Sequence, residues 1–185
     1  IVHCPFSASL PKSVIRHITD RQKGPWKPNS STILCQHHEV RPIGGLVGHN
    51  EAGGRIMDCY ARGNVLGDEG SQRLGGLVGY NRGDMINCYA SGDISAGKGS
   101  RDLGGLIGGG SLVGDGHRFE IPASTCYYLR PVENIVLTNS IGFALWEEDL
   151  KKRSSFIGWD FENIWMICEG RDYPRLRWEG MQCPP

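Results

Sequence analysis

Between Pro42 and about Arg130, short apolar segments alternate with glycine-rich or polar turns, and the alternation recurs. The segment IGGLVG at 43–48 returns as LGGLVG at 74–79 and as LGGLIG at 103–108, so its copies are nearly evenly spaced. A second segment, DCYARGNV at 58–65, returns at almost the same spacing as NCYASGDI at 87–94. Self-similarity at a fixed period of about 20 to 50 residues is the signature of a repeat architecture.

The pattern inside each copy predicts β-structure. In the second copy, β-prone apolar residues predict strands at 77–80, 85–90 and 93–95, and glycine or polar residues predict the turns between them. No copy contains the ten or more residues at helical spacing that a helical repeat needs. Three short strands and three turns describe one coil of a β-solenoid, so we expect an all-β fold of about three coils over residues 42–130.

Stacking of such coils predicts columns of equivalent residues, because neighbouring strands lie about 4.8 Å apart. The expected columns are Leu46 with Leu77 and Leu106, Ile56 with Ile86, Cys59 with Cys88, Tyr60 with Tyr89, and Val65 with Ile94. The repeated glycines are expected to turn the backbone where a Cβ would clash. These are Gly44, Gly45, Gly48, Gly75, Gly76, Gly79, Gly104, Gly105 and Gly108. In the third copy, residues 109–118 predict an inserted loop.

The segments on either side of the repeats differ from them in composition and lack their period. Residues 1–41 are rich in proline and polar residues and predict an irregular segment or a degenerate cap, with a short strand at Ile33–Cys35. Residues 131–180 predict a small α+β, aromatic-rich module that seals the last coil, and residues 181–185 predict the start of a linker.

The expected module has one helix and three strands. Residues 145–153 predict the helix, with acid-before-base pairs four residues apart: Glu147–Lys151, Glu148–Lys152 and Asp149–Arg153. The aromatic segments 156–161, 164–168 and 173–178 predict the strands.

Composition and charge narrow the classes of partner. The chain has 20 lysine and arginine residues and 20 aspartate and glutamate residues, so its formal net charge is zero. It therefore has no overall positive charge to attract nucleic acid or an anionic membrane. No apolar run reaches the roughly 18 residues of a membrane-spanning helix. Because the chain begins at Ile1 and not at Met, we interpret it as a piece of a larger protein.

The seven cysteines are too few and too spread for a disulfide scaffold. The best disulfide candidates are Cys168 with Cys183, and Cys4 with Cys35. Cys59 and Cys88, with Cys126, are expected to form an inward column of small apolar thiols, with disulfide formation or metal ligation as the alternatives.

Candidate catalytic and metal-binding residues have simpler structural interpretations. The sequence His37-His38-Glu39 lacks the H-E-x-x-H spacing of a zinc peptidase, and the glycine segments match no phosphate-binding loop. Of the aspartates Asp58, Asp84, Asp93 and Asp102, the first is replaced by Asn in the next copy and Asp93 by Asn64 in the previous one, an exchange that suits a turn and not a catalytic carboxylate. We therefore expect no catalytic residue, metal or cofactor. His49 takes the place of Tyr80, as a substitution within a column.

Four tyrosines are the candidate binding residues: Tyr60, Tyr89, Tyr127 and Tyr128. If their rings point outward, they form a platform for sugars or for a protein partner. If they point inward, they belong to the core. The sequence leaves both possibilities open.

The doubled pattern, GGL[VI]G followed by [DN]CYAxG[ND][VI], resembles the GLUG repeat, and the C-terminal segments resemble the module that often closes such arrays. The resemblance implies a right-handed β-helix-like solenoid in a secreted or surface protein of bacteria, such as adhesin-like proteins and the N-terminal regions of IgA-specific metallopeptidases. It carries over no catalytic residues.

These observations predict a non-catalytic, extracytoplasmic repeat module that serves adhesion to a surface glycan or protein partner within a larger protein. The alternatives are a passive structural spacer and an accessory region of a secreted peptidase or glycan-degrading enzyme. Binding of nucleic acid and insertion into a membrane are not expected.

Overall fold

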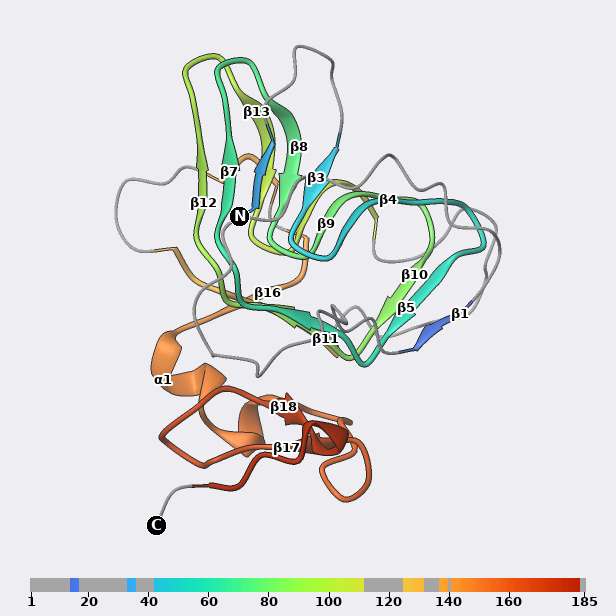
Figure 1. The fold of residues 1–185 in the computed structure, drawn as a ribbon, viewed down its shortest axis with the longest axis vertical. Helices are drawn as coiled ribbons and strands as arrows, with labels where there is room; N and C mark the ends of the chain where they lie inside the picture. Colours follow the sequence, from blue (N-terminus) through green and yellow to red (C-terminus); the bar gives the residue numbers. More distant parts are fainter. Residues whose placement is uncertain are drawn as a thin grey trace.

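The protein is described by a computed structural model that covers residues 14–16, 33–35, 42–111, 125–131, 137–139 and 141–183. The regular structure of the described chain is mainly β-strand, and the repeats pair with one another in parallel (Figure 1). This confirms the all-β prediction. Below, residues 42–111 and 125–129 are called the repeat stack, and residues 146–183 the C-terminal module.

The first two copies of the repeat have five short strands each, listed here in chain order. The first copy contains β3 (Ile43–Gly44), β4 (Val47–Asn50), β5 (Arg55–Met57), β6 (Tyr60–Ala61) and β7 (Val65–Gly67). The second contains β8 (Gln72–Gly75), β9 (Val78–Asn81), β10 (Asp84–Ile86), β11 (Cys88–Ala90) and β12 (Ile94–Ala96). In the third, the described strands are β13 (Arg101–Gly104), β14 (Ile107–Gly110) and β15 (Cys126–Leu129).

The prediction of three strands per copy was wrong for two reasons: β8 was not predicted, and the predicted strand 85–90 is bent in the middle. Asn87 has a φ of 52°, and Asp58, its equivalent in the first copy, has a φ of 51°. A left-handed residue departs from the extended conformation and bends the chain, and Asp and Asn are the non-glycine residues that adopt this conformation most readily. The bend divides the segment into β10 and β11 and turns the chain from one sheet into the next.

Register follows the sequence period at most of the predicted columns. Tyr60 pairs with Tyr89, Val65 with Ile94, and Cys88 with Cys126. The Leu46 amide donates to the carbonyl of Leu77, and the Leu77 amide donates to that of Leu106, both at 2.9 Å. Equivalent residues of successive copies therefore lie over one another.

The predicted column of Ile56 with Ile86 was wrong by one position. Ile56 pairs with Met85, and both side chains are buried, whereas Ile86 pairs with Met57. Side chains alternate between the two faces of a strand, so a shift of one residue exchanges the core face for the outer face. The spacing that leads from Asp58 to Asn87 in this part of the repeat also leads from Ile56 to Met85, and the prediction overlooked it.

The glycine pairs occupy corners that lack room for a side chain, as predicted. A Cβ at Gly75 would collide with the carbonyl oxygen of Val78 and with the backbone nitrogen of Gly108 in the next copy. Gly44 meets the equivalent atoms of Val47 and Gly79. The GGL[VI]G segment is thus required by the close approach of the backbone both within a copy and between copies.

Two strands from the N-terminal segment extend the stack. The predicted strand Ile33–Cys35 is present as β2 and pairs with β7, while β1 (Val14–Arg16), which was not predicted, pairs with β5. Both pairings are parallel. Part of the N-terminal segment therefore covers the first repeat.

Parallel pairing onto the stack also continues beyond position 130, the predicted end of the repeats. The amides of Thr138 and Asn139 both donate to the carbonyl of Leu103, and β16 (Phe143–Leu145) pairs in parallel with β15. The predicted inserted loop at 109–118 is described only as far as Ser111, and its first two residues extend β14; the rest lies outside the described residues.

The C-terminal module contains short elements: α1 (Glu147–Leu150), η2 (Arg153–Ser155), β17 (Trp165–Met166), β18 (Arg175–Leu176) and η3 (Arg177–Glu179). The helix is shorter than predicted, and residues 156–161 form turns and not a strand. Lys151 pairs with Glu147 at 2.6 Å as expected, but Lys152 pairs with Asp149, because the helix ends before it could face Glu148. None of the helices in the described ranges has the length and apolar character needed to cross a bilayer.

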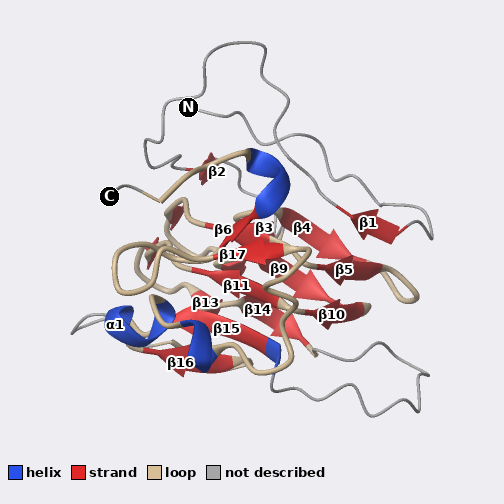
Figure 2. Cartoon of the chain, turned by 90° about the horizontal axis from the view of Figure 1, so that it is seen from below, coloured by secondary structure: helices blue, strands red, loops and turns tan. Residues whose placement is uncertain are grey.

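The module lies against the side of the stack and not over its last coil, which corrects the predicted position of the cap (Figures 1 and 2). It covers the sheet formed by β6, β11, β15 and β16. One hydrophobic cluster, which includes Ile56, Leu77, Met85 and Leu106, fills the interior of the stack. A second, largely aromatic cluster fills the space between stack and module.

Candidate functional site

The tyrosines form a ladder on the outer side of the stack. Tyr60, Tyr89 and Tyr127 occupy equivalent positions on β6, β11 and β15, and Phe143 follows them on β16. The rings of Tyr60 and Tyr89 are stacked, with centroids 5.2 Å apart and planes within 6°. The name tyrosine ladder is used below for Tyr60, Tyr89 and Tyr127.

Tyr128, the fourth predicted member, faces the other way. It pairs with Ala90, which in turn pairs with Ala61, and it belongs to the cluster that fills the interior of the stack. Adjacent residues of a strand point to opposite faces. Tyr128 is therefore a core residue and does not share a surface with Tyr127.

The C-terminal module buries the tyrosine ladder. Phe156 and Trp159 contact the rings of Tyr89 and Tyr127, while Trp165 contacts those of Tyr60 and Tyr89, with centroid distances between 5.2 and 6.4 Å. Tyr89 is 0% exposed and Tyr127 is 4% exposed. The proposed exposed platform at Tyr60, Tyr89, Tyr127 and Tyr128 does not fit this burial, because the rings already have an aromatic partner within the chain.

Polar contacts fix the module to the ladder. The Tyr89 hydroxyl donates to the carbonyl oxygen of Pro174 at 2.6 Å, and the Tyr60 hydroxyl donates to the Glu179 carboxylate at 2.8 Å. Burial raises the pKa of Tyr89 well above its usual value. Burial, followed by the neighbouring Glu179 carboxylate, raises the pKa of Tyr60. Both phenols are therefore neutral donors at physiological pH.

An ion pair adds to these contacts. Arg62 on the stack donates to Asp172 at 2.8 Å, and Arg175 donates to the other carboxylate oxygen of Asp172 at 2.9 Å. The guanidinium of Arg62 also lies over the ring of Tyr173, 4.9 Å from its centroid. Sequence reasoning missed Arg62, Asp172 and Glu179 as docking residues. Their only sequence signal was their place near aromatic segments, which does not identify a partner more than 100 positions away.

The cysteine column is buried, as predicted. Cys59, Cys88 and Cys126 form no disulfide and have at most 4% exposure, and Cys88 pairs with Cys126 in the strand register. The Cys88 thiol donates to the carbonyl of Ile86 at 3.1 Å, and burial raises the pKa of this thiol. Within the described ranges, no three His, Cys, Asp or Glu side chains are grouped as metal ligands would be. The column packs as small apolar side chains.

The predicted disulfide between Cys168 and Cys183 is present, with the two Cα atoms 5.4 Å apart. The second predicted disulfide, between Cys4 and Cys35, involves Cys4, which lies outside the described residues. His37, His38 and Glu39 also lie outside the described residues. The observed bond closes the end of the module into a loop that contains Asp172, Pro174 and Glu179.

Three of the candidate aspartates have structural roles. Asp58 occupies a left-handed corner and accepts from the Asn87 side chain at 3.1 Å, while Asp102 has a left-handed backbone, with a φ of 58°, within β13. Asp84 is buried, with the Arg55 guanidinium 3.8 Å from its carboxylate. The exchange of Asp and Asn between copies thus reflects backbone geometry, as expected from the sequence. His49 pairs with Tyr80 in register, which confirms its place in a column.

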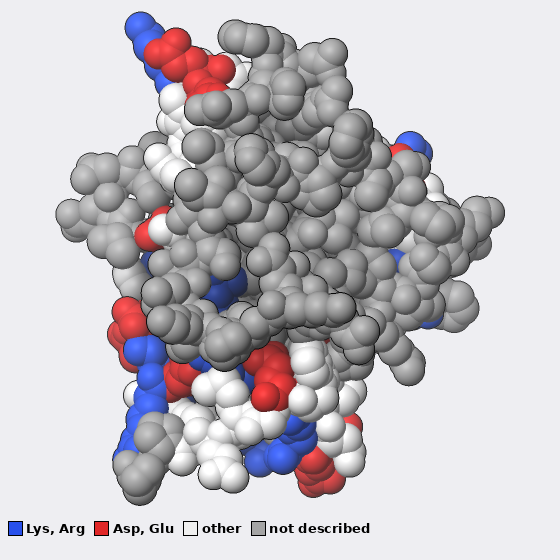
Figure 3. Space-filling view, in the orientation of Figure 1, with Lys and Arg blue, Asp and Glu red and all other residues white. Residues whose placement is uncertain are grey.

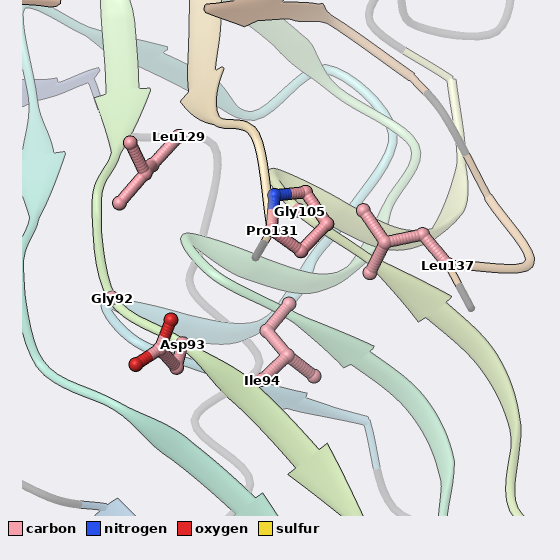
Figure 4. Close-up of a pocket in the computed structure, with 7 residues that line it drawn as sticks. All are labelled: Gly92, Asp93, Ile94, Gly105, Leu129, Pro131 and Leu137. Atoms are coloured by element: carbon pink, nitrogen blue, oxygen red, sulfur yellow. The ribbon is translucent and has the colours of Figure 1, made fainter. Parts of the chain in front are cut away.

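Asp93, the remaining candidate aspartate, lines a small cavity between the corner after β11 and the segment that follows β15 (Figure 4). Its apolar lining includes Ile94, Leu129, Pro131 and Leu137. The cavity volume of about 10 Å³ has room for roughly one water molecule. It is too small for a substrate.

Comparison with known families identifies the repeat. Residues 43–66 and 70–95 match the family model described as the GLUG motif. The chain carries GLUG repeats. The matches run from β3 into β7 and from the turn before β8 into β12, so the unit of the GLUG repeat here corresponds to the five-strand unit that stacks. No curated protein and no solved structure matches the chain.

Proposed function

We propose that the repeat stack is a short right-handed β-helix-like solenoid, and that it serves as a non-catalytic interaction module outside the cytoplasm, within a larger protein. The observation that carries the proposal is the parallel stacking of equivalent residues. The repeated leucines, glycines and cysteines lie in the core or at corners, and the repeated tyrosines hold the C-terminal module. The repeated residues thus build a rigid body, and the residues that differ between copies remain for recognition.

The disulfide supports the extracytoplasmic part of the proposal. Disulfides persist in oxidising compartments and are rare in the cytosol. Cys183 is exposed, so a cytosolic reductant would reach the bond. A chain that depended on this bond would suit a secreted or surface location.

The surface of the module is the place where we expect a partner. Trp146 is 54% exposed, and the guanidinium of Arg130 lies over its ring, 4.5 Å from the centroid. An exposed aromatic ring beside a cation suits the apolar face and the hydroxyl groups of a sugar. Figure 3 shows acidic and basic side chains interspersed over the module, so charge of one sign does not dominate this face.

The test is binding of the full chain to a glycan array and to isolated cell-envelope fractions. We expect saturable binding that Trp146→Ala abolishes and that Ile157→Ala, at a 73% exposed position in the same module, leaves intact. Saturable binding that Trp146→Ala does not affect would contradict the assigned surface.

A folded chain that binds nothing would overturn the interaction role in favour of a passive spacer. One observation already favours that alternative, since the most prominent aromatic surface, the tyrosine ladder, is used internally. An accessory role in a peptidase or glycan-degrading enzyme would instead be supported by a hydrolase domain in the parent protein.

A further inference from the structure

The C-terminal segment that holds the tyrosine ladder is closed by an accessible disulfide. Residues 168–183, called the docking segment below, are joined at their ends by the Cys168–Cys183 bond. This segment supplies Asp172 to Arg62, the Pro174 carbonyl to Tyr89, and Glu179 to Tyr60. Cys168 is half-buried, whereas Cys183 is exposed.

The rest of the module contacts the stack in a different way. Its residues 156–165 pack the rings of Phe156, Trp159 and Trp165 against the tyrosine ladder, and these rings are nearly fully buried. The docking segment contributes one buried apolar side chain to this cluster, Leu176, and covers the hydroxyl ends of Tyr60 and Tyr89. The docking segment thus supplies the hydrogen bonds to the two tyrosine hydroxyls and to Arg62. Residues 156–165 supply most of the buried aromatic rings, together with indole hydrogen bonds from Trp159 to the Thr125 carbonyl and from Trp165 to Asp58.

The docking segment has little regular structure to hold it. It contains β18, which has two residues, and η3, which has three. Its backbone is tied to the rest of the module by the short pairing of β18 with β17 and by hydrogen bonds that include Gly170 to Lys151 at 2.8 Å and Arg177 to Ile164 at 2.9 Å. Because these elements are only two and three residues long, covalent closure of the ends is expected to contribute to holding the segment in place.

We propose that the Cys168–Cys183 disulfide is a redox-sensitive latch, and that its reduction by a dithiol releases the docking segment and uncovers Tyr60 and Tyr89. A thiolate of the reductant attacks the exposed Cys183 sulfur, and Cys168 leaves as the thiolate. The second thiol of the reductant then displaces Cys183, so the reductant becomes a cyclic disulfide. The two cysteines receive two electrons and two protons.

The latch requires no binding partner, so it is tested separately from the interaction role. Opening a loop with a sequence separation of 15 is expected to raise the population of the released segment about 100-fold. Hydrogen exchange of the Gly170 and Arg177 amides should accelerate by about this factor when the full chain is treated with a dithiol. The Leu77 amide, which donates to Leu106 inside the stack, should not change and serves as the internal reference.

A second readout follows the tyrosines directly. Nitration of Tyr89 by tetranitromethane, located by peptide mass spectrometry, should be slow in the oxidised chain because its hydroxyl is buried against Pro174. It should rise at least about tenfold on reduction, a lower limit set well below the 100-fold expectation. Tyr80, on another sheet, is the matched tyrosine whose nitration should not change.

The double variant Cys168→Ser with Cys183→Ser separates this bond from the other cysteines. Without reductant it should show the exchange and nitration of the reduced chain, and adding reductant should cause no further change. Equal exchange and equal Tyr89 nitration in the oxidised and reduced chains would overturn the proposal. Acceleration at Leu77 to the same extent as at Arg177 would also overturn it, because reduction would then unfold the whole molecule and not release a latch.

Discussion

The repeat stack and the C-terminal module are stabilised in different ways. In the stack, each strand pairs with its equivalent in the next copy, and equivalent side chains pack on one another. The module has one short hairpin, one turn of α-helix and a disulfide, and two of the eight buried residues in its core cluster, Tyr89 and Tyr127, belong to the stack. We therefore expect the stack to fold without the module, whereas the core of the module includes side chains of the stack.

This difference gives a one-way dependence that can be measured with two probes. Four of the five tryptophans lie between positions 146 and 178, so tryptophan fluorescence reports mainly on the module. Far-ultraviolet circular dichroism reports mainly on the strands of the stack. A change in the stack should affect both signals, and a change in the module should affect only the first.

The largest effect is expected from Gly75→Ala, which breaks the stack itself. The new Cβ would collide with backbone atoms of Val78 and Gly108, so two copies have to move apart. We expect a loss of more than about 3 kcal/mol in the free energy of unfolding, at the upper end of overpacking effects. Denaturant titration should show both probes shifted together.

The control for that variant is Gly70→Ala in an open turn. Gly70 has a φ of 71°, but a Cβ there would meet nothing within 4 Å. Only the left-handed backbone then disfavours alanine, at about 1 kcal/mol. Equal losses in the two variants would show that packing between copies is not what the glycine at position 75 provides.

The next largest effect is expected from Trp165→Ala, which breaks the module alone. Trp165 is 0% exposed and contacts Tyr60, Tyr89 and Trp159. Removing a buried tryptophan costs about 3 to 5 kcal/mol. The fluorescence transition should shift to much lower denaturant concentration while the circular dichroism transition changes little; a joint shift of both would contradict the one-way dependence. Ile157→Ala is the exposed control.

The difference between the periodic contacts of the stack and the non-periodic contacts of the module also determines which contacts could be predicted from the sequence. The strand pairing of the stack could be predicted because its contacts join equivalent positions of successive copies. The spacing of the repeated segments in the sequence therefore indicates both which strands pair and in which register. The exceptions are local. Counting Ile86 in place of Met85 was an error of one residue, and the bend at Asn87 reflects a backbone angle that the apolar pattern does not encode.

The docking of the module could not be predicted in this way. Its contacts join positions that share no period, such as Tyr60 with Glu179 and Arg62 with Asp172. The sequence showed two aromatic-rich regions, the tyrosines of the repeat and the cluster after position 146, but not that one covers the other. The proposed binding platform was placed on the tyrosines for this reason, although the outward direction of three of the four was one of the two possibilities considered.

A smaller and pH-dependent effect is expected at Asp172. Burial raises the pKa of this carboxyl, but the hydrogen bonds from Arg62 and Arg175 outweigh burial, so its pKa lies below the usual value. A depressed pKa stabilises the folded state above the unfolded value, near 4, and the contribution is lost as the pH falls through the folded pKa. Docking of the module should therefore weaken below about pH 4.

Asp172→Asn tests that dependence. Because the pair is partly exposed, we expect a loss of only about 1 kcal/mol at pH 7, seen in the fluorescence transition. The difference between variant and wild type should shrink as the pH falls from 6 to about 2.5. A difference that stays constant over this range would mean that the charge of Asp172 contributes nothing. Asp149→Asn, on the exposed helix, is the matched control.

The smallest effect is expected from Asp58→Asn, at the junction of the two regions. The Asp58 carboxylate accepts from Asn87 of the next copy at 3.1 Å and from the Trp165 indole of the module at 3.4 Å, and its backbone is left-handed. An asparagine tolerates the same backbone and offers the same acceptor oxygen, so the change should cost less than about 0.5 kcal/mol on both probes. Asp58→Ala removes the acceptor and suits the backbone poorly, and should cost about 1 to 2 kcal/mol. If Asn and Ala were equally disruptive, the negative charge of Asp58 and not its geometry would be the property that matters, and the structural interpretation of the exchange between Asp58 and Asn87 would fail.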